Sequence, residues 1–398
     1  MTSSILKLND NAQGIWITGA RLPGYADPQQ LWIDPQGLIQ RIQPQQSLGD
    51  WPGPVWDLGG DWLSLGGVDL QINGALGLAF PDLTAANQNQ LQEISQVLWQ
   101  QGVDGFLPTI VTSPLAKIRH ALATIADFLS LNQSTAPAAE IYGVHLEGPF
   151  LNPAKRGAHP QEHLLPLERE QLERVLGEYA ALVKVITLAP ELDVDGNAIA
   201  HLVDLGIIVS LGHSLATASQ AQAAFDRGAT MVTHAFNAMP GLHHREPGLL
   251  GAAILDPRVW CGVIADGEHI CPPMLEILLR TQGEGAGCFL VSDALAPLGL
   301  PDGFYPWDER QMQVKNGTAR LPEGTLCGTT LPVLAGVANL VQWGILPLAA
   351  AIALGTEAPR KAIGLPGLGM GQPARNLLHW QQHPTTGAVT WQRLFAAD

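Results

Sequence analysis

Residues 207–245 read IIVSLGHSLATASQAQAAFDRGATMVTHAFNAMPGLHHR, and the prediction of the fold rests on this stretch. Two short apolar runs, Ile207–Leu211 and Ala229–Thr233, are each followed closely by a histidine, and the Ala-rich segment Leu215–Arg227 between them has helical composition. Short apolar runs that alternate with a helix are typical of parallel strands joined by a crossover. The stretch therefore predicts strand, helix and strand, with a histidine at the carboxyl end of each strand.

His213 and His234, which follow the two runs, are candidates for a functional site. The carboxyl edge of the sheet carries the active site both in β/α barrels and in open α/β sheets. A neutral imidazole at that edge can bind a metal, act as a general base or serve as a buried polar group. Two histidines in equivalent positions, followed by the polar residues of segment 237–245, favour a site over a purely structural role.

Composition and charge exclude several classes of protein. The 398 residues include 43 glycines and 30 prolines, and 46% are apolar, which is typical of a compact, loop-rich α/β protein. A net charge of −15 without any basic run argues against nucleic acid as a partner. An anionic substrate must therefore meet a local site, because the overall field repels it.

The expected location follows from what the sequence lacks. No apolar run reaches membrane-spanning length, and the N-terminus shows no signal-peptide pattern, so we expect a cytoplasmic protein with no membrane partner. Four cysteines without close spacing predict buried or half-buried free thiols in a reducing compartment: Cys261, Cys271, Cys288 and Cys327.

From residue 65 onward the chain alternates between strand-like runs and helical patterns. Eight strand candidates over about 230 residues match the size of a (β/α)8 barrel of the TIM type. An open doubly wound sheet is the alternative, but no Gly-rich turn follows the first strand as that fold requires. The eight candidates are Leu65–Asn73, Asp104–Thr112, Glu140–Glu147, Leu182–Ala189, Ile207–Leu211, Ala229–Thr233, Val259–Ala265 and Gly287–Ser292.

The two ends of the chain predict a second, smaller domain. Residues 1–59 contain short strand-like runs split by Gly, Pro and Asp turns, which indicates an antiparallel β unit too small to close alone. Segments 377–380 and 388–394 return to strand character. We therefore expect residues 1–59 and 359–398 to form a small β-sandwich domain, and residues 60–358 to form a metal-dependent hydrolase barrel. The long polar excursion Asp302–Cys327 is predicted to be a lid or a wall of the site.

Polar residues at the predicted strand ends form a set suited to a metal. Glu147, His213 and His234 suffice to bind one Zn²⁺-like ion with an open position for water. Asp293, after the eighth strand, would then act as the base that accepts the proton of the metal-bound water. Gln71 and Asn73 follow the first strand, and neither side chain is a strong ligand for such a metal.

Several motifs together resemble the N-acetylglucosamine-6-phosphate deacetylase family of the amidohydrolase superfamily. The resemblance covers nearly the whole chain, and the motifs are specific only in combination. They are HLEGPF at 145–150, KRGAH at 155–159, GHS at 212–214, THAFNAMP at 233–240, REPG at 245–248 and SDA at 292–294.

The resemblance implies hydrolysis of the acetamide of N-acetylglucosamine 6-phosphate, with a metal-bound water as nucleophile and Asp293 as general base and acid. Many amidohydrolases carry His-x-His after the first strand, where this chain has Gln71-Ile72-Asn73. We therefore expect one divalent ion per chain, Zn²⁺ first, with Fe²⁺, Co²⁺ or Mn²⁺ as alternatives, and Gln71 and Asn73 shaping the pocket of the missing second metal.

The resemblance also implies a set of residues that contact the substrate. His159 is expected near the acetyl carbonyl or a sugar hydroxyl, and His269 near the sugar. Asn237, Ala238 and Arg245 are the expected phosphate contacts, with the arginine offered across a homodimer interface, where a guanidinium can bind phosphate in a bidentate manner. Lys155 and Arg156 precede His159, and for them a role in the site and a place on a solvated surface loop are equally expected.

Two alternatives remain at this point. The same site could act on N-acetylgalactosamine 6-phosphate or another N-acyl compound, because sequence does not locate the residue that reads the distinguishing hydroxyl. A catalytically silent sugar-phosphate-binding scaffold is the alternative from another class, although intact Glu147, His213, His234 and Asp293 argue against it.

Overall fold

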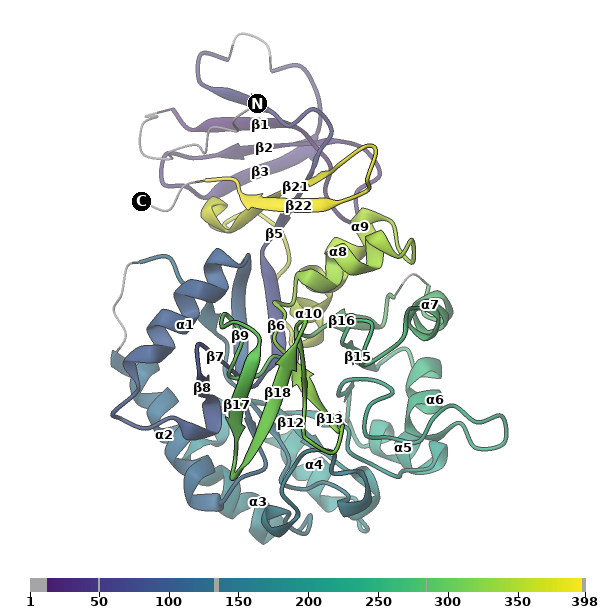
Figure 1. Ribbon diagram of the computed structural model, residues 1–398. Coiled ribbons are helices and arrows are strands. Elements are labelled where there is room, and N and C mark those ends of the chain that lie inside the picture. Colours follow the sequence, from purple (N-terminus) through teal and green to yellow (C-terminus); the bar gives the residue numbers. More distant parts are fainter. Residues whose placement is uncertain (1–12, 49–50, 132–135, 284, 396–398) are drawn as a thin grey trace.

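The computed structural model describes residues 13–48, 51–131, 136–283 and 285–395. Within these residues, eight parallel strands form a barrel, which confirms the predicted (β/α)8 fold (Figure 1). The strands follow chain order around the barrel: β6 (Gly67–Ile72), β9 (Val103–Val111), β11 (Val144–Glu147), β12 (Val183–Leu188), β13 (Ile208–Leu211), β14 (Met231–Val232), β15 (Trp260–Val263) and β16 (Cys288–Leu290).

The barrel closes between its last strand and its first. The amide of Asp293 donates to the carbonyl of Gln71 at 2.9 Å, and the amide of Asn73 donates to the carbonyl of Ala294 at 2.7 Å. Closure excludes the open doubly wound sheet, in which the two outer strands remain unpaired. It also places Gln71, Asn73 and Asp293 side by side at the mouth of the barrel.

Helices cover the outside of the barrel because every barrel strand is buried on both faces. Each helix presents an apolar stripe to the strands, as in α1, where Leu91, Ile94 and Leu98 are buried. The helices are α1 (Asn89–Gln100), α2 (Leu115–Leu131), α3 (Arg169–Leu176), α4 (Asn197–Asp204), α5 (Ala218–Asp226), α6 (Gly248–Leu255), α7 (Pro272–Thr281), α8 (Ala335–Gln342), α9 (Leu348–Gly355) and α10 (Glu357–Ala362). None of those in the described residues is long and apolar enough to cross a membrane.

The two ends of the chain build two small sheets at one end of the molecule (Figure 1). β3 (Ile39–Pro44), β2 (Gln29–Ile33), β1 (Ile15–Ala20) and β4 (Val55–Asp57) form one, and β22 (Val389–Arg393), β21 (Leu377–Gln382) and β5 (Trp62–Leu65) form the other. Apolar side chains of both sheets share one core, for example Ile17, Leu63 and Leu394.

One detail of the predicted β unit was wrong, because β4 pairs with β1 in parallel. The split at residues 59 and 359 remains a prediction, and residues 1–12 of the predicted small domain lie outside the described residues. The helix α10, which spans that second boundary, packs against β6 and β16 of the barrel.

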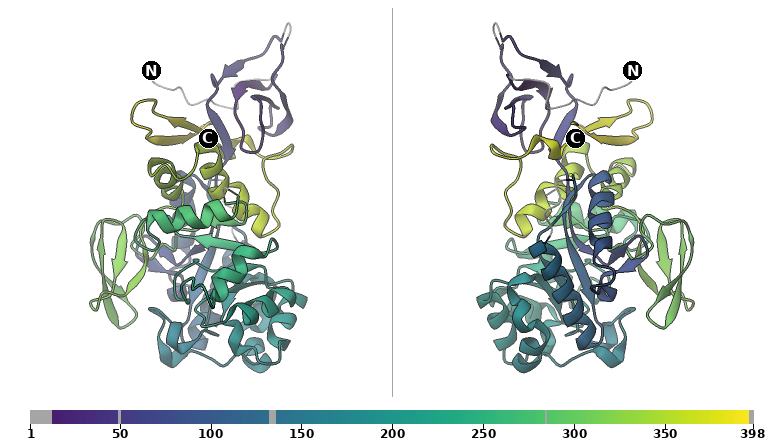
Figure 2. Two further views of the ribbon diagram at one scale, coloured as in Figure 1. Left: turned by 90° about the vertical axis from the view of Figure 1, so that its right-hand side faces the viewer. Right: turned by 90° about the vertical axis from the view of Figure 1, so that its left-hand side faces the viewer.

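Segment 303–329 is a four-stranded antiparallel sheet, where the sequence suggested an irregular excursion. Its strands are β17 (Gly303–Trp307), β18 (Arg310–Lys315), β19 (Thr318–Arg320) and β20 (Leu326–Thr329). The strands are polar with alternate buried positions, as in β18, where only Met312 and Val314 are buried. Figure 2 shows this sheet, in bright green, projecting from the side of the barrel.

Candidate active site

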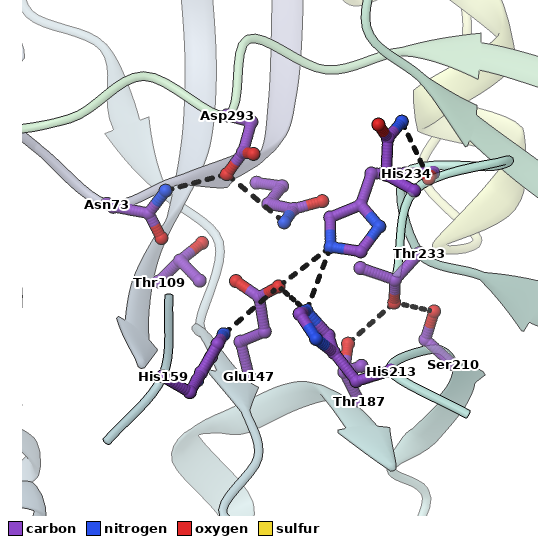
Figure 3. Close-up of polar contacts among 12 residues, drawn as sticks. Asn73, Thr109, Glu147, His159, Thr187, Ser210, His213, Thr233, His234 and Asp293 are labelled. Carbon is purple, nitrogen blue, oxygen red and sulfur yellow. Dashed lines mark hydrogen bonds and ion pairs between the residues drawn. The ribbon is translucent and has the colours of Figure 1, made fainter. Parts of the chain in front are cut away.

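Glu147, His213 and His234 meet at the mouth of the barrel, from the ends of β11, β13 and β14. Oε1 of Glu147 lies 3.0 Å from Nε2 of His213 and 3.1 Å from Nε2 of His234. The two imidazole nitrogens are themselves 3.0 Å apart. Figure 3 shows the three side chains pointing toward one another, so residues that are distant in sequence form one compact cluster.

The backbone at the strand ends turns these side chains inward. His213, His234 and Asp293 adopt positive φ angles of 49°, 27° and 48°. A side chain other than glycine in this left-handed region costs on the order of 1–3 kcal/mol, and such strain concentrates at functional sites. Three strained residues, each two or three positions after the end of a barrel strand, indicate that the fold gives up local stability to orient these groups.

The imidazole of His213 is held in one tautomer. Its Nδ1 donates to the backbone carbonyl of Lys155 at 2.9 Å, so its Nε2 carries the lone pair that faces Glu147. Burial lowers the pKa of His213 to about 4, although the neighbouring Glu147 carboxylate raises it. The ring is therefore neutral at physiological pH, which is the form that binds a metal.

Glu147 carries the negative charge of the cluster. Burial raises its pKa, but the adjacent imidazoles of His159, His213 and His234 outweigh burial and hold the pKa well below the ordinary value. Burial by itself lowers the pKa of His234. Its hydrogen bond with Glu147 and the negative charges of Glu147 and Asp293 outweigh burial, so the pKa lies above the ordinary value. The cluster thus combines an ionised carboxylate with two buried imidazoles.

These residues fit a single divalent cation. One ligand atom from each of Glu147, His213 and His234 lies within 4.8 Å of the others, and all three residues are buried. Two imidazole nitrogens 3.0 Å apart can share at most one proton between them, whereas a cation at their focus satisfies both lone pairs and the carboxylate. The donor set of one carboxylate and two imidazoles suits Zn²⁺ or a related first-row metal.

Asp293 lies beside the cluster and is held by two carboxamides. Its Oδ1 accepts from Nδ2 of Asn73 at 2.7 Å and from Nε2 of Gln71 at 3.3 Å. Burial and the negative charge of Glu147 raise the pKa of Asp293 well above the ordinary value, despite the hydrogen bond from Asn73. Asp293 is thus a carboxyl group with high proton affinity next to the candidate metal position, as a general base requires.

A cavity of about 350 Å³ opens above this cluster and contains most of the predicted substrate contacts. Besides the cluster and Asp293, it is lined by Asn73, His159, Asn237, Ala238 and His269. The ring of His269 is fixed by Asp266, whose Oδ2 accepts from Nδ1 at 2.6 Å, so Nε2 of His269 is the nitrogen left for a ligand. Ala238 has a φ of 50°, which turns the backbone sharply at the cavity wall.

Two of the predicted site residues lie elsewhere. Gln71 is behind Asp293 and does not line the cavity. Arg245 is exposed, and its guanidinium hydrogen-bonds His244 at 3.0 Å. Within one copy of the chain, Arg245 therefore stays outside the cavity.

The cavity also contains Lys155, for which the sequence left two interpretations open, and two residues that the sequence did not single out. Lys155 lines it and donates to the carbonyl of Met239 at 3.2 Å, so it is more than a solvated loop residue. Trp307 and Cys327, from the sheet β17–β20, form another part of the wall. Both residues lie within Asp302–Cys327, the segment predicted to be a lid or a wall of the site, although the sequence did not single them out, and Lys155 stands in the same loop as His159.

The cysteines differ from the prediction at one position. Cys271 is exposed, because it precedes α7 and caps the start of that helix from the surface. Cys261 and Cys288 are buried and Cys327 is half-buried, and none of the four forms a disulfide.

A hydrogen-bonded chain of side chains lies beneath the cluster. Nδ1 of His145 donates to the carbonyl of Leu70 at 2.9 Å, and Nε2 of His145 lies 2.7 Å from the hydroxyl of Thr187. Thr233 then contacts both Thr187 and Ser210 at 2.6 Å, as Figure 3 shows. These contacts tie β11, β12, β13 and β14 together directly below the groups that they position.

Similarity to known proteins agrees with this geometry. The chain is 36% identical to N-acetylgalactosamine-6-phosphate deacetylase from Escherichia coli O157:H7, over 88% of this chain and 90% of that protein. It is 34% identical to N-acetylglucosamine-6-phosphate deacetylase from Bos taurus, over 89% of this chain and 83% of that protein. The chain belongs to the N-acetylglucosamine-6-phosphate deacetylase family.

Solved structures of this deacetylase family share the fold. A mutant of the Mycobacterium smegmatis N-acetyl-D-glucosamine-6-phosphate deacetylase, in complex with N-acetyl-D-glucosamine-6-phosphate, aligns with a TM-score of 0.82 at 27% identity. The alignment covers 96% of this chain and 98% of that chain. No model of a protein family matches the chain. The assignment of the chain to the deacetylase family therefore rests on similarity that extends over the barrel and the small sheets together.

Proposed function

We propose that this chain hydrolyses the acetamide of N-acetylglucosamine 6-phosphate, giving glucosamine 6-phosphate and acetate. The observation that carries the proposal is the buried cluster of Glu147, His213 and His234 beside Asp293, in a chain of the deacetylase family. A carboxylate and two imidazoles next to a strongly basic carboxyl group form the minimum set for metal-assisted amide hydrolysis.

Glu147, His213 and His234 would hold one divalent ion, Zn²⁺ first, with Fe²⁺, Co²⁺ or Mn²⁺ as alternatives. When bound, such an ion polarises the acetyl carbonyl and lowers the pKa of a coordinated water to about 7. The chain contributes the rest of the chemistry. Its strained strand ends orient the ligands, and burial excludes bulk water from the reacting groups.

Asp293 is the proposed proton carrier. Because its Oδ1 accepts hydrogen bonds from Asn73 and Gln71, Oδ2 is the oxygen that can accept the proton of the attacking water. The same oxygen can return that proton to the amine nitrogen as the C–N bond breaks. His159, whose Nε2 lies 3.8 Å from Oε1 of Glu147, is placed to donate to the carbonyl oxygen as negative charge develops there.

The opposite side of the cavity is the proposed sugar-phosphate site. His269 offers Nε2 to a sugar hydroxyl, and the backbone of Ala238 offers its N–H group to phosphate. Asn237, the other expected phosphate contact, donates its side-chain amide to the carbonyls of His234 at 3.2 Å and Ala235 at 3.1 Å, so it would have to release one of them to bind phosphate.

The net charge of −15 repels a phosphate group from the molecule as a whole. Among the described residues that line the cavity, Lys155 is the one lysine or arginine that could attract it. We therefore keep the proposal that Arg245 of a second copy completes the site in a homodimer, since the loop that carries it is exposed.

N-Acetylgalactosamine 6-phosphate is the second candidate substrate. It is favoured by the 36% identity to the E. coli protein that carries that name. The two sugars differ in the orientation of one hydroxyl, so the ratio of kcat/KM for the two phosphates separates the candidates. A cytoplasmic location stays a prediction.

The deciding experiment is acetate release from N-acetylglucosamine 6-phosphate by purified protein, with bound metal counted before and after chelation. We expect activity that is proportional to one metal per chain, lost on chelation and restored by Zn²⁺. Metal bound at one per chain without acetate release from either hexosamine phosphate would reject the substrate and retain the metal site. Metal-free protein with full activity would reject the mechanism.

A further inference from the structure

The fourth barrel strand contributes no side chain to the candidate metal cluster, but a residue just after it is bonded to the segment that carries one of the ligands. β12 ends at Leu188, and Glu191 lies in the short 3-10 turn that follows, Pro190–Leu192. The side chain of Glu191 is half-buried and does not line the cavity. Any influence of Glu191 on the chemistry must therefore act through its neighbours.

The carboxylate of Glu191 accepts three hydrogen bonds from two separate segments. Its Oε1 accepts from the backbone amide of Leu215 at 2.6 Å and from Nδ2 of Asn152 at 2.8 Å. Its Oε2 accepts from the hydroxyl of Ser214 at 2.6 Å. Ser214 and Leu215 directly follow His213, whereas Asn152 lies in the loop after β11. One carboxylate at the end of β12 thus ties together the segments that leave β13 and β11.

The loop after β11 is bonded to His213 as well, so the contacts close a ring. The amide of Asn152 donates to the carbonyl of His213 at 2.9 Å, and Nδ1 of His213 donates to the carbonyl of Lys155 at 2.9 Å. The amide of Lys155 in turn donates to the carbonyl of Asn152 at 2.9 Å. The loop that Glu191 anchors therefore holds both the backbone and the ring of His213.

His213 needs this support because its backbone is strained. Its φ of 49° lies in the left-handed region, which a residue other than glycine retains only where the surrounding structure enforces it. Glu191 fixes the next two residues of the chain by hydrogen bonds that its negative charge strengthens. Without the carboxylate, the strained segment would relax and the imidazole would lose its orientation.

We propose that Glu191 is a positioning residue, which holds His213 in the orientation that binds the metal ion. This inference rests on the proposed function, in which Glu147, His213 and His234 bind one divalent ion. Loss of a group that orients a metal ligand typically weakens metal binding about 10- to 100-fold. Glu191 acts on His213 through backbone contacts, so we expect an effect at the lower end of that range.

The affinity for Zn²⁺ of the chain stripped of metal, measured by competition with a chromophoric chelator, tests the proposal. Glu191→Met removes all three acceptors at similar length, and we expect the dissociation constant to rise about 10-fold. Glu191→Gln retains a carbonyl oxygen for Leu215 and Asn152, so its dissociation constant should rise only about 3-fold. An equal rise in the two variants would assign the effect to the lost charge and overturn the positioning role.

The visible absorption of the Co²⁺-loaded chain is the second readout, because it reports how the ligands are arranged around the ion. We expect a shifted spectrum in Glu191→Met and a spectrum close to wild type in Glu191→Gln. Asp193→Leu is the matched control, since this nearby carboxylate accepts from the backbone amides of Ala198 at 3.1 Å and Ile199 at 3.0 Å and thus holds α4. It should unfold at lower urea concentration but keep the Zn²⁺ affinity and Co²⁺ spectrum of wild type.

Several outcomes would overturn the proposal. One is wild-type affinity and spectrum in Glu191→Met, and another is an equally large loss of affinity in Asp193→Leu, which would assign the effect to stability. If Glu191→Met does not fold, Ser214→Ala decides, because it removes one of the three hydrogen bonds and leaves the charge. A rise of about 3-fold in its dissociation constant supports the proposal, and an unchanged value overturns it. A wild-type chain that binds no Zn²⁺ would instead reject the metal site of the proposed function.

Discussion

Asn73 donates a hydrogen bond of 2.7 Å to Oδ1 of Asp293, across the seam where the last barrel strand meets the first. Gln71 donates to the same oxygen at 3.3 Å. Two neutral amide groups therefore hold this oxygen of the carboxylate in place. They orient Asp293 without lowering its proton affinity as far as a cation would.

Replacing Asp293 tests the proposed proton carrier. Asp293→Asn retains the shape of the side chain but cannot accept a proton, so we expect bound metal to be unchanged and kcat to fall about 10²–10⁴-fold. Asp195→Asn, at an exposed aspartate that does not line the cavity, is the control and should keep normal turnover. Near-normal kcat in Asp293→Asn would remove Asp293 from the mechanism.

Replacing Asn73 tests the orientation of that carboxylate. Asn73→Leu removes the donor at similar size, and a hydrogen bond to a charged group contributes about 1.5–3 kcal/mol, so we expect kcat to fall about 10- to 100-fold. Bound metal should stay at the wild-type level, because Asn73 does not belong to the ligand cluster. Loss of metal in this variant would show that Asn73 supports the metal site instead.

His145 should make stability depend on pH. Burial lowers its pKa in the folded chain to about 4, against the charge of the nearby Glu147, whereas an unfolded histidine has a pKa of about 6.5. Between these values the unfolded state binds the proton and the folded state does not, so the free energy of unfolding falls as pH drops from about 6.5 toward 4. The contribution is about 1.4 kcal/mol per pH unit at most.

Urea unfolding of chelator-treated protein at pH 7 and pH 5 measures this dependence. His145→Gln lacks the titrating group and should lose less stability between the two values than wild type does. An equal loss in both proteins would assign the effect to other groups.

Asp104 should be critical for joining the small sheets to the barrel. Its fully buried carboxylate accepts from Arg360 at 2.8 Å and from Arg393 at 2.6 Å. Removal of one partner of a buried pair leaves uncompensated charge, so Asp104→Asn should cost about 3–5 kcal/mol in urea unfolding. The exposed pair Arg169–Glu173 is the control, and Glu173→Gln should cost less than about 1 kcal/mol. Similar costs for both variants would contradict this role.

The barrel and its metal cluster were accessible from sequence for one physical reason. Glu147, His213, His234 and Asp293 each stand at or directly after a short apolar run, and parallel strands bring such ends to one edge. The location of these four residues at strand ends therefore predicted that their side chains lie close together.

The sequence predicted that segment Asp302–Cys327 forms a lid or a wall of the site, but it could not show which of its side chains reach the cavity, because that depends on how the segment docks on the barrel. Trp307 and Cys327 reach the cavity only because the sheet β17–β20 folds against the barrel mouth. That sheet has polar strands with few buried positions, so its sequence resembles a loop. The hydrogen bonds of Glu191 also became visible only with coordinates, since sequence does not reveal which loops a carboxylate joins.

The pairing of β5 with β21 has a consequence for how the chain is made. Leu63 and Leu65 lie against His379 and Leu377, which leave the ribosome only after all eight barrel strands have been synthesised. Until then β5 is an unpaired edge next to a finished N-terminal sheet, and such edges recruit other chains. Translation that stops before residue 377 would therefore release a product that aggregates, with the eight barrel strands complete but the small core open.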